Sequence, residues 1–362
     1  LRTWKVSRND FMPRAPITLR RITSHSAGFT IHGFPGYPMG SPLPSIIQVL
    51  DGKAPANTDP VRVVRRPGRE IRYSGGGVTV EQLVLMDVTG KAFPDIMREL
   101  VLDPLGMKRS SFQQPLPEKL SDNAARAHGL TGRPIGVRWH VYPEMAAAGL
   151  WTTATDLARF AITVRDAALG RRQEIASARF ARAMLTPSGL GQERNDYGVG
   201  FRIAGRGSNL FFGHSGANRG YQADLILFLD SGAGAAIMTN SDRGRGLIDE
   251  ILATLDHVYA WPGDTFAPKP RFVGQVSDKQ LERFTGAYRM RFAFGGSAEI
   301  FVQDAEPYLN VDLGPLGDSV FLPESENRLF SDDLDLDLEF VDTDVVLSVG
   351  SRVIGHGTRT EP

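Results

Sequence analysis

The stretch that decides the fold is residues 209–240, NLFFGHSGANRGYQADLILFLDSGAGAAIMTN. A short aromatic segment, Asn209–Gly213, precedes a long apolar run, Tyr221–Asp230, and a returning run, Ala233–Thr239, follows a Ser-Gly turn. Apolar runs separated by turn residues in this way are typical of neighbouring antiparallel strands. From Leu247 to Val258 the apolar side chains then follow helical spacing. Strands followed by a covering helix predict an α+β fold, an antiparallel sheet flanked by helices.

Further helices are expected upstream of this stretch. Apolar spacing after Thr79, with Thr79 and Gln82 placed to form a capping box, predicts a helix that ends at Gly90. A second apolar stripe, Phe93–Val101, and a helix that begins after Thr153 show the same spacing. These helices provide the apolar faces that a flanked sheet needs.

The C-terminal part of the chain has a different pattern. Residues 263–276 are rich in Pro and Gly and indicate a linker between a first domain, residues 1–262, and a second, residues 277–362. In Leu334–Phe340 apolar residues alternate with acidic ones, which places the leucines on one face of a strand. Similar short segments around it predict a small all-β barrel. The acidic residues between Asp332 and Asp344 lack the glycine-containing loop of an EF-hand, so a solvated strand face is favoured over a calcium site.

The composition excludes several classes of function. The 41 basic and 41 acidic residues cancel, so no net charge draws the chain to nucleic acid or to an anionic membrane. The absence of cysteine excludes disulfides, thiolate metal sites and a cysteine nucleophile. No apolar run approaches the roughly 20 residues of a membrane span.

Four short patterns occur in a fixed order along the chain, and each is weak when taken alone. They are Thr18–Gly28; Pro67-Gly68 with Tyr73–Gly77 and Asp103–Met107; Ala148–Thr153 with Asp156–Phe160; and Gly213–Gly216. Their order and spacing resemble the serine β-lactamase and penicillin-binding-protein superfamily, in particular its branch of class C β-lactamases, DD-peptidases and β-lactamase-fold esterases. The resemblance covers about residues 1–260. The C-terminal barrel resembles the lipocalin-like domain that many such hydrolases carry.

The resemblance implies a site built around Tyr73. In the family a Tyr-x-Asn loop supplies a phenol that moves protons for a serine nucleophile, and Tyr73 matches this phenol as the general base. Ser74 is its neighbour, and Gly75 stands where the family usually has Asn, which argues against efficient β-lactam hydrolysis more than against ester cleavage. The substrate-binding strand of the family matches His214, Ser215 and Gly216. Because an unperturbed phenol has a pKa near 10, Tyr73 needs a nearby cation, and a protonated His214 is one candidate.

Three aromatic residues are candidates for the wall of a substrate pocket. They are Tyr37, which lies in a Gly/Pro-rich frame, Tyr142 and Trp151. The structural alternatives are ordinary ones, since a lone Tyr after a Pro-Gly turn is usually packed and a His before a strand can cap an edge. Ser24-His25-Ser26 is expected to be a structural loop near the site and not a source of the nucleophile. Gly213–Ala217 ends in Ala, which excludes the Gly-x-Ser-x-Gly elbow of an α/β-hydrolase.

The nucleophile motif of the family, Ser-x-x-Lys, is absent from the 362 residues. The resemblance places this motif several tens of residues before Thr18, so we expect the chain to be an N-terminal truncation. In that case Ala233–Thr239 would border absent strands and leave an open, apolar edge. Such an edge would recruit the missing segment or another copy of the chain.

We therefore expect the parent protein to be a serine hydrolase that acts through an acyl-enzyme on esters, amides or β-lactams, with esterase or peptidase action favoured. The alternative is a non-catalytic pseudoenzyme that binds a peptide or peptidoglycan. The expected partner is a small-molecule or peptide substrate, and no metal or organic cofactor is implied. The resemblance favours a periplasmic or secreted location, although the sequence is also compatible with the cytoplasm.

Overall fold

The structure is a computed structural model, and in it the chain folds into two compact units. The first comprises Leu1–Gly129, Pro134–Gly244 and Leu255–Thr265, and the second comprises Leu130–Arg133, Arg245–Thr254 and Phe266–Pro362. The structure describes residues 1–11, 14–129, 132–191, 196–263, 265–266, 271, 273–292, 297–305, 308–313, 318–331, 336–349 and 352–360. Of the expected linker, residues 264, 267–270 and 272 therefore lie outside the described residues.

The first unit contains the antiparallel sheet that the sequence predicts. Its strands pair in chain order and are β3 (Asp196–Tyr197), β4 (Arg202–Ala204), β5 (Phe211–Asn218), β6 (Tyr221–Phe228) and β7 (Gly234–Thr239). β5 is longer than the expected Asn209–Gly213, because pairing with β6 continues as far as Asn218 opposite Tyr221. Within the described residues β7 pairs only with β6 and forms an edge of the sheet.

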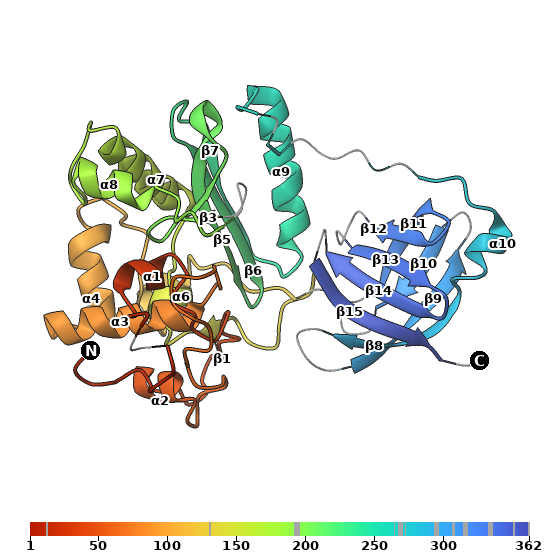
Figure 1. Cartoon of the computed structure of the whole chain (residues 1–362), viewed down its shortest axis with the longest axis horizontal. Helices are drawn as coiled ribbons and strands as arrows, with labels where there is room; N and C mark the ends of the chain where they lie inside the picture. The colour runs from red at the N-terminus through yellow and green to blue at the C-terminus, as the bar shows by residue number, and fades with distance from the viewer. Residues whose placement is uncertain are drawn as a thin grey trace. The chain divides into compact units, whose positions relative to one another are not determined.

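Two helices pack against one face of this sheet (Figure 1). They are α7 (Ala154–Ala168), which begins after the expected cap Thr153, and α8 (Ala178–Met184). Small side chains such as Ala161 and Val164 bring α7 close to the sheet, where Phe212 is fully buried. The helix α9 (Gly244–Tyr259) begins before the expected Leu247. None of the helices in the described part of the chain combines the length and apolar character needed to cross a bilayer.

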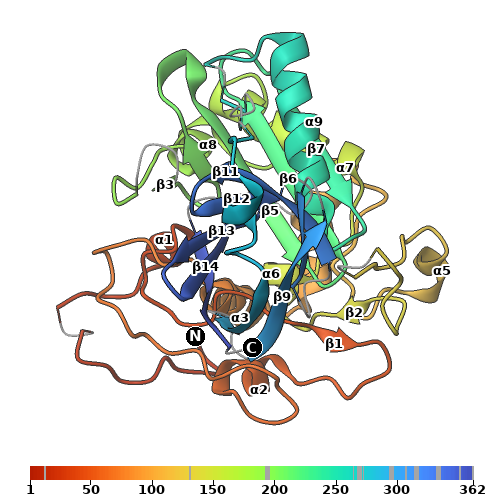
Figure 2. The same ribbon diagram turned by 90° about the vertical axis from the view of Figure 1, so that its right-hand side faces the viewer.

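Further helices of the first unit gather around α3 (Gly75–Thr89), as both views show (Figures 1 and 2). They are α1 (Leu19–Thr23), α2 (Ile46–Asp51), α4 (Phe93–Met97) with a π-helical extension over Arg98–Leu102, and α6 (Met145–Ala148). The short helix α5 (Glu118–Ser121) lies apart from them (Figure 2). A 3-10 turn spans Gly207–Asn209, and a two-stranded sheet joins β1 (Tyr37–Pro38) to β2 (His140–Val141).

The start of α3 differs from the expectation. The helix begins at Gly75 and is capped by Ser74, five residues before the expected cap Thr79. Glycine has a low helix propensity, so the run Gly75-Gly76-Gly77 does not predict a helix by itself. The predicted end at Gly90 is confirmed, because Gly90 adopts a left-handed φ of 68° as the C-cap.

The second unit is the predicted all-β barrel. Its strands are β8 (Gly286–Phe292), β9 (Ser297–Ala305), β10 (Tyr308–Asp312), β11 (Asp318–Ser325), β12 (Arg328–Ser331), β13 (Leu336–Val341), β14 (Asp344–Val349) and β15 (Arg352–Arg359), with a helical turn α10 (Asp278–Leu281) before them. Antiparallel pairing of β15 with β8 closes the barrel. Its interior is filled by apolar side chains, among them Met290, Phe321 and Leu338.

One acidic residue of the barrel departs from the expected solvated face. Leu336, Leu338 and Phe340 point into the core as predicted, and Glu339 is exposed, but Asp337 is only 3% exposed. The Asp337 carboxylate forms ion pairs with Arg271, which precedes the barrel, and with Arg328 of β12. The two guanidinium groups cover the carboxylate, which explains its burial. Residues 332–335, including Leu334 and Asp335, lie outside the described residues.

Candidate active site

Tyr73 is held where an extended segment enters α3. Ser74, the cap of α3, accepts a hydrogen bond at its Oγ from the Gly77 N–H (2.9 Å) and donates one to the Thr30 carbonyl (2.6 Å). The carbonyls of Ile31 and His32 accept from the Gly76 and Gly75 N–H groups, both at 3.0 Å. The segment 30–32 thus satisfies the first N–H groups of α3 and fixes the backbone next to Tyr73.

This close approach explains the glycines that follow Tyr73. A Cβ on Gly76 would lie 2.8 Å from the Thr30 carbonyl oxygen, which is too close for any side chain. A Cβ on Gly75 would lie 3.1 Å from the His32 carbonyl oxygen and 3.2 Å from the Phe34 ring. A side chain at position 75 would require these neighbours to move by a few tenths of an ångström, which favours glycine there.

His214 is the residue of the sheet that contacts the Tyr73 hydroxyl. It lies on β5 opposite Leu225 of β6, and its Nδ1 is 2.6 Å from the carbonyl oxygen of Ser215. A carbonyl only accepts, so Nδ1 carries the proton and Nε2 is left as an acceptor. Nε2 lies 3.4 Å from the Tyr73 hydroxyl, which makes Tyr73 the donor in a long hydrogen bond between residues 141 positions apart.

Three further aromatic rings surround Tyr73. The ring centroid of His25 lies 4.1 Å from that of Tyr73, that of His32 lies 4.8 Å away, and that of Tyr197 lies 6.0 Å away. Tyr197 also contacts His25 edge-on, with 4.8 Å between centroids. His25 was expected in a structural loop near the site, but its contact with Tyr73 was not predicted, and none of the four patterns contains His32 or Tyr197.

Burial makes this cluster neutral. Burial, with a smaller contribution from Tyr197, raises the pKa of Tyr73 to about 12. Burial lowers the pKa of His214, and it lowers that of His25 to about 3 with the help of the neighbouring histidines. At neutral pH His214 is therefore uncharged, and it does not supply the cation that was expected to lower the pKa of Tyr73. The pair can move a proton only as neutral phenol and neutral imidazole.

The outer half of β5 offers backbone groups beside this pair. β4 pairs with β5 only from Phe211 to Gly213, so no described strand lies on the β4 side of residues 214–218. Ser215 and Gly216 are exposed there. An extended chain can pair with such a strand edge through main-chain hydrogen bonds, which is a common way of binding peptides.

The three pocket-wall candidates have structural contacts of their own. The Tyr37 hydroxyl accepts from the Asn57 N–H (3.1 Å), and the Tyr142 hydroxyl accepts from the Arg219 N–H (2.9 Å), and both tyrosines are buried. Trp151 packs edge-on against the rings of Trp139 and Tyr221, and its buried indole nitrogen has no hydrogen-bond partner among the described residues. These contacts do not join the three residues to Tyr73, and their place in a pocket stays a prediction.

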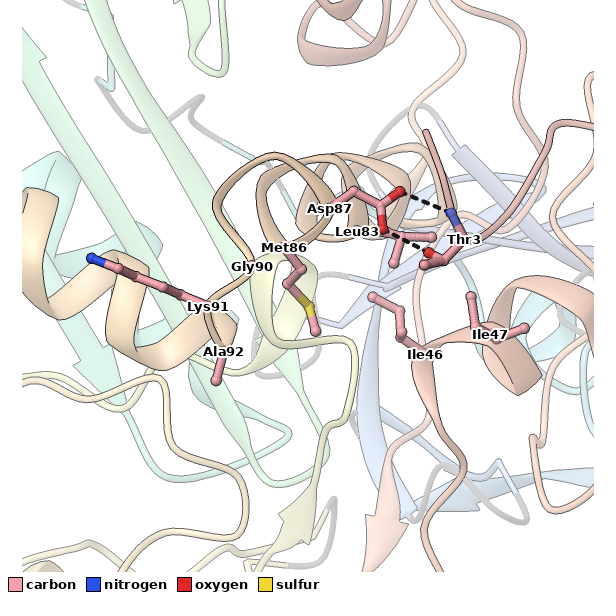
Figure 3. A pocket seen from close by; sticks show the side chains of 9 residues that line it. All are labelled: Thr3, Ile46, Ile47, Leu83, Met86, Asp87, Gly90, Lys91 and Ala92. Atoms are coloured by element: carbon pink, nitrogen blue, oxygen red, sulfur yellow. Dashed lines mark hydrogen bonds between the residues drawn. The ribbon is translucent and has the colours of Figure 1, made fainter.

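A separate open pocket of about 440 Å³ lies at the C-terminal end of α3 (Figure 3). Tyr73 lies at the other end of this helix, just before its first residue Gly75. Its lining residues are Thr3, Ile46, Ile47, Leu83, Met86, Asp87, Gly90, Lys91 and Ala92. The Asp87 carboxylate accepts from the N–H and the hydroxyl of Thr3 at 3.2 and 2.7 Å, which ties the first residues of the chain to α3. Within the described residues, no group of three or more His, Asp or Glu side chains is placed to hold a metal ion.

The sequence of this chain is similar to those of known proteins over most of its length. Residues 10–258 match the family model described as Beta-lactamase. Penicillin-binding protein 4 of Amycolatopsis lactamdurans is 26% identical over 302 residues, which is 75% of this chain and 73% of that protein.

Two solved structures share the fold. The octameric penicillin-binding protein homologue from Pyrococcus abyssi matches 97% of this chain and 82% of its own, with a TM-score of 0.52 and 19% identity. The penicillin binding protein from Bacillus halodurans matches 65% of this chain and 71% of its own, with a TM-score of 0.50 and 18% identity. The first of these similarities extends beyond the residues that the family model matches.

Proposed function

Because the chain belongs to the beta-lactamase family, we propose that its function is that of a serine hydrolase, which cleaves esters or amides through an acyl-enzyme. The observation that carries the proposal is the contact between the Tyr73 hydroxyl and Nε2 of His214 at 3.4 Å. A donor and an acceptor in a partly buried pair beside an exposed strand edge are suited to proton transfer for a substrate bound on that edge.

In the proposed acylation step, a serine oxygen attacks the carbonyl carbon of the substrate. The serine proton passes to the Tyr73 oxygen while the Tyr73 proton passes to Nε2 of His214, and the carbonyl π electrons move onto the carbonyl oxygen. Collapse of the tetrahedral intermediate breaks the bond to the leaving group, which takes up the proton from the pair. Water then attacks the acyl carbon and gives a proton to the pair, and collapse of this intermediate breaks the bond to the serine oxygen, which takes the proton back as the acid is released.

The substrate is an ester or a peptide more readily than a β-lactam. At Gly75 the amide that the family usually provides is absent, and the His32 carbonyl and the Phe34 ring occupy the space beside it. Pairing of an extended substrate with Ser215 and Gly216 needs only backbone groups. We expect kcat/KM for a short-chain aryl ester to exceed that for a cephalosporin, and the reverse order would refute this preference.

The test of the proton-transfer role is Tyr73→Phe. Because these 362 residues contain no Ser-x-x-Lys, kinetics are measured on the product of the whole open reading frame. We expect kcat to fall by about two orders of magnitude or more, since the ring remains but the transferable proton is lost. The matched control is Tyr288→Phe, which removes a buried hydroxyl that donates to the Phe284 carbonyl inside the barrel. An unchanged acylation rate in Tyr73→Phe would mean that Tyr73 only packs and transfers no proton.

The second candidate function is a pseudoenzyme that binds a peptide on the same strand edge. It is favoured by the absence of Ser-x-x-Lys from the sequence. Intact-mass spectrometry after exposure to a fluorophosphonate distinguishes the two, because only an enzyme with an activated serine gains one adduct per molecule. Binding of a peptide without any adduct on the whole gene product would support the pseudoenzyme.

A further inference from the structure

His25 holds the backbone on both sides of Tyr73. Its carbonyl oxygen accepts from the Arg72 N–H at 2.7 Å, and its ring Nδ1 accepts from the Ser74 N–H at 3.2 Å. Its ring also lies against the Tyr73 ring, with 4.1 Å between centroids and 35° between planes. One residue thus fixes the residue before the tyrosine, the residue after it, and the face of its ring.

The conformation of His25 is unusual for a residue with a side chain. Its φ is 53°, in the left-handed region, and it is only 4% exposed. Its N–H donates to the Ile22 carbonyl, and the hydroxyls of Ser24 and Ser26 on either side contact each other at 2.9 Å. A strained backbone persists only where its surroundings fix it, and here those surroundings are the end of α1 and the Tyr73 segment.

The hydrogen bond to Ser74 also fixes the tautomer of His25. Since Nδ1 is the acceptor, the ring proton is on Nε2. Burial keeps the ring neutral, because it lowers the pKa of His25 to about 3. His25 therefore places no positive charge beside the phenol, and its influence on Tyr73 is geometric.

We propose that His25 is a positioning residue that sets the distance between the Tyr73 hydroxyl and Nε2 of His214. The inference rests on the proposed function, in which this pair transfers the proton. The His25 side chain contributes the acceptor for the Ser74 N–H and the ring that packs against Tyr73, in addition to the bonds that segment 30–32 makes with Ser74, Gly75 and Gly76. The 3.4 Å contact is already near the limit of a hydrogen bond, so a small shift of the Tyr73 ring would break it.

The test measures the protonation midpoint of His214 by NMR of the histidine side chains in the chain as it stands. A hydrogen bond from Tyr73 stabilises the neutral imidazole, so loss of the bond raises the midpoint. Tyr73→Phe removes the donor and should raise the His214 midpoint by about half a pH unit or more. Arg202, Asp224, the Ser215 carbonyl and the Tyr197 ring also act on or contact His214, and none of them is changed in the variants. His25 interacts with His214 as well, but burial lowers the pKa of His25 to about 3, so its removal takes no charge away near neutral pH.

Two substitutions of His25 separate its contacts. His25→Phe keeps a ring against Tyr73 but has no acceptor for the Ser74 N–H. His25→Asn tolerates a positive φ and keeps an acceptor, but it lacks the ring. We expect His25→Phe to raise the His214 midpoint as much as Tyr73→Phe does, the double variant to add nothing further, and His25→Asn to raise it less.

Each outcome bears on one claim. If both His25 variants leave the His214 midpoint unchanged while Tyr73→Phe moves it, the positioning role is wrong and the proton-transfer pair stands. If Tyr73→Phe itself has no effect, the pair and with it the proposed function fail. The His128 resonance reports on folding, since its ring contacts Asn240 away from these substitutions. In the whole gene product, His25→Phe should lower kcat with little change in KM.

Discussion

Glu144 is a buried acid that the proposed chemistry does not use. It precedes α6, is fully buried, and neither carboxyl oxygen has a hydrogen-bond partner among the described residues. Gln82 holds the backbone on both sides of it, donating to the Pro143 carbonyl (3.1 Å) and accepting from the Ala146 N–H (2.9 Å). Burial raises the pKa of Glu144 from 4.5 to about 7. Ionisation of this residue should therefore destabilise the fold.

The direction and size of the effect follow from the two pKa values. Below pH 4.5 the carboxyl is protonated in both the folded and the unfolded chain, and its ionisation costs the fold nothing. As the pH rises from 4.5 to about 7, the unfolded chain ionises and the folded chain does not, so stability is lost progressively. Above pH 7 the full penalty remains, and at 1.36 kcal/mol for each pH unit it amounts to about 3 kcal/mol. The neighbouring tyrosines, Tyr37 and Tyr142, feel the same charge, since an ionised Glu144 raises the pKa of both.

Glu144→Gln removes this penalty. The amide resembles the protonated carboxyl, so we expect the variant to match the wild-type chain within about 1 kcal/mol at pH 4.5 and to exceed its stability by up to about 3 kcal/mol at pH 8.5. Urea unfolding at both pH values measures the difference. The control is Glu118→Gln on the exposed face of α5, which should change nothing at either pH. Burial also raises the pKa of Glu81, to about 8, but that contribution is common to wild type and variant and cancels. A stability difference that is the same at both pH values would refute the reasoning.

Two further predictions concern packing. Gly213→Ala should prevent β5 from pairing with β6, because the new Cβ would lie 1.7 Å from the Leu225 carbonyl oxygen, and loss of the cooperative thermal transition of the first unit would show this. Asp337→Asn should destabilise the barrel by about 2 kcal/mol, since two partly exposed arginines lose their buried counter-ion, whereas Glu339→Gln on the same strand should have no effect in the same denaturation assay.

Features with local causes were predictable from the sequence. The helix α7 begins after Thr153 as expected, because the Thr153 hydroxyl accepts from the Asp156 N–H three residues on. The strand pair of residues 221–239 and the alternating leucines of β13 follow from a period that a single segment displays. The order of the four patterns, read through the family resemblance, also implied that Tyr73 and His214 border the same site.

Features with distant causes were not predictable in this way. The start of α3 depends on the Thr30 carbonyl, which accepts from the cap Ser74, and no helix propensity in the glycine run reveals it. The burial of Asp337 depends on Arg271, 66 residues earlier. His25 was set aside as a structural loop because its positive φ and its contacts with Tyr73 arise only when α1 meets the 72–74 segment.

The crowded surroundings of Gly75 also constrain how this sequence can change. Asn at this position is the usual residue of the family, yet a side chain there competes for space with the His32 carbonyl and the Phe34 ring. A single Gly75→Asn exchange would therefore be penalised before it conferred any benefit. The His32 carbonyl and the Phe34 ring would have to move by a few tenths of an ångström, and substitutions in the 32–34 segment can ease or hinder that movement. Position 75 and residues 32–34 are thus in contact, so the effects of mutations at the two places on stability are not expected to add.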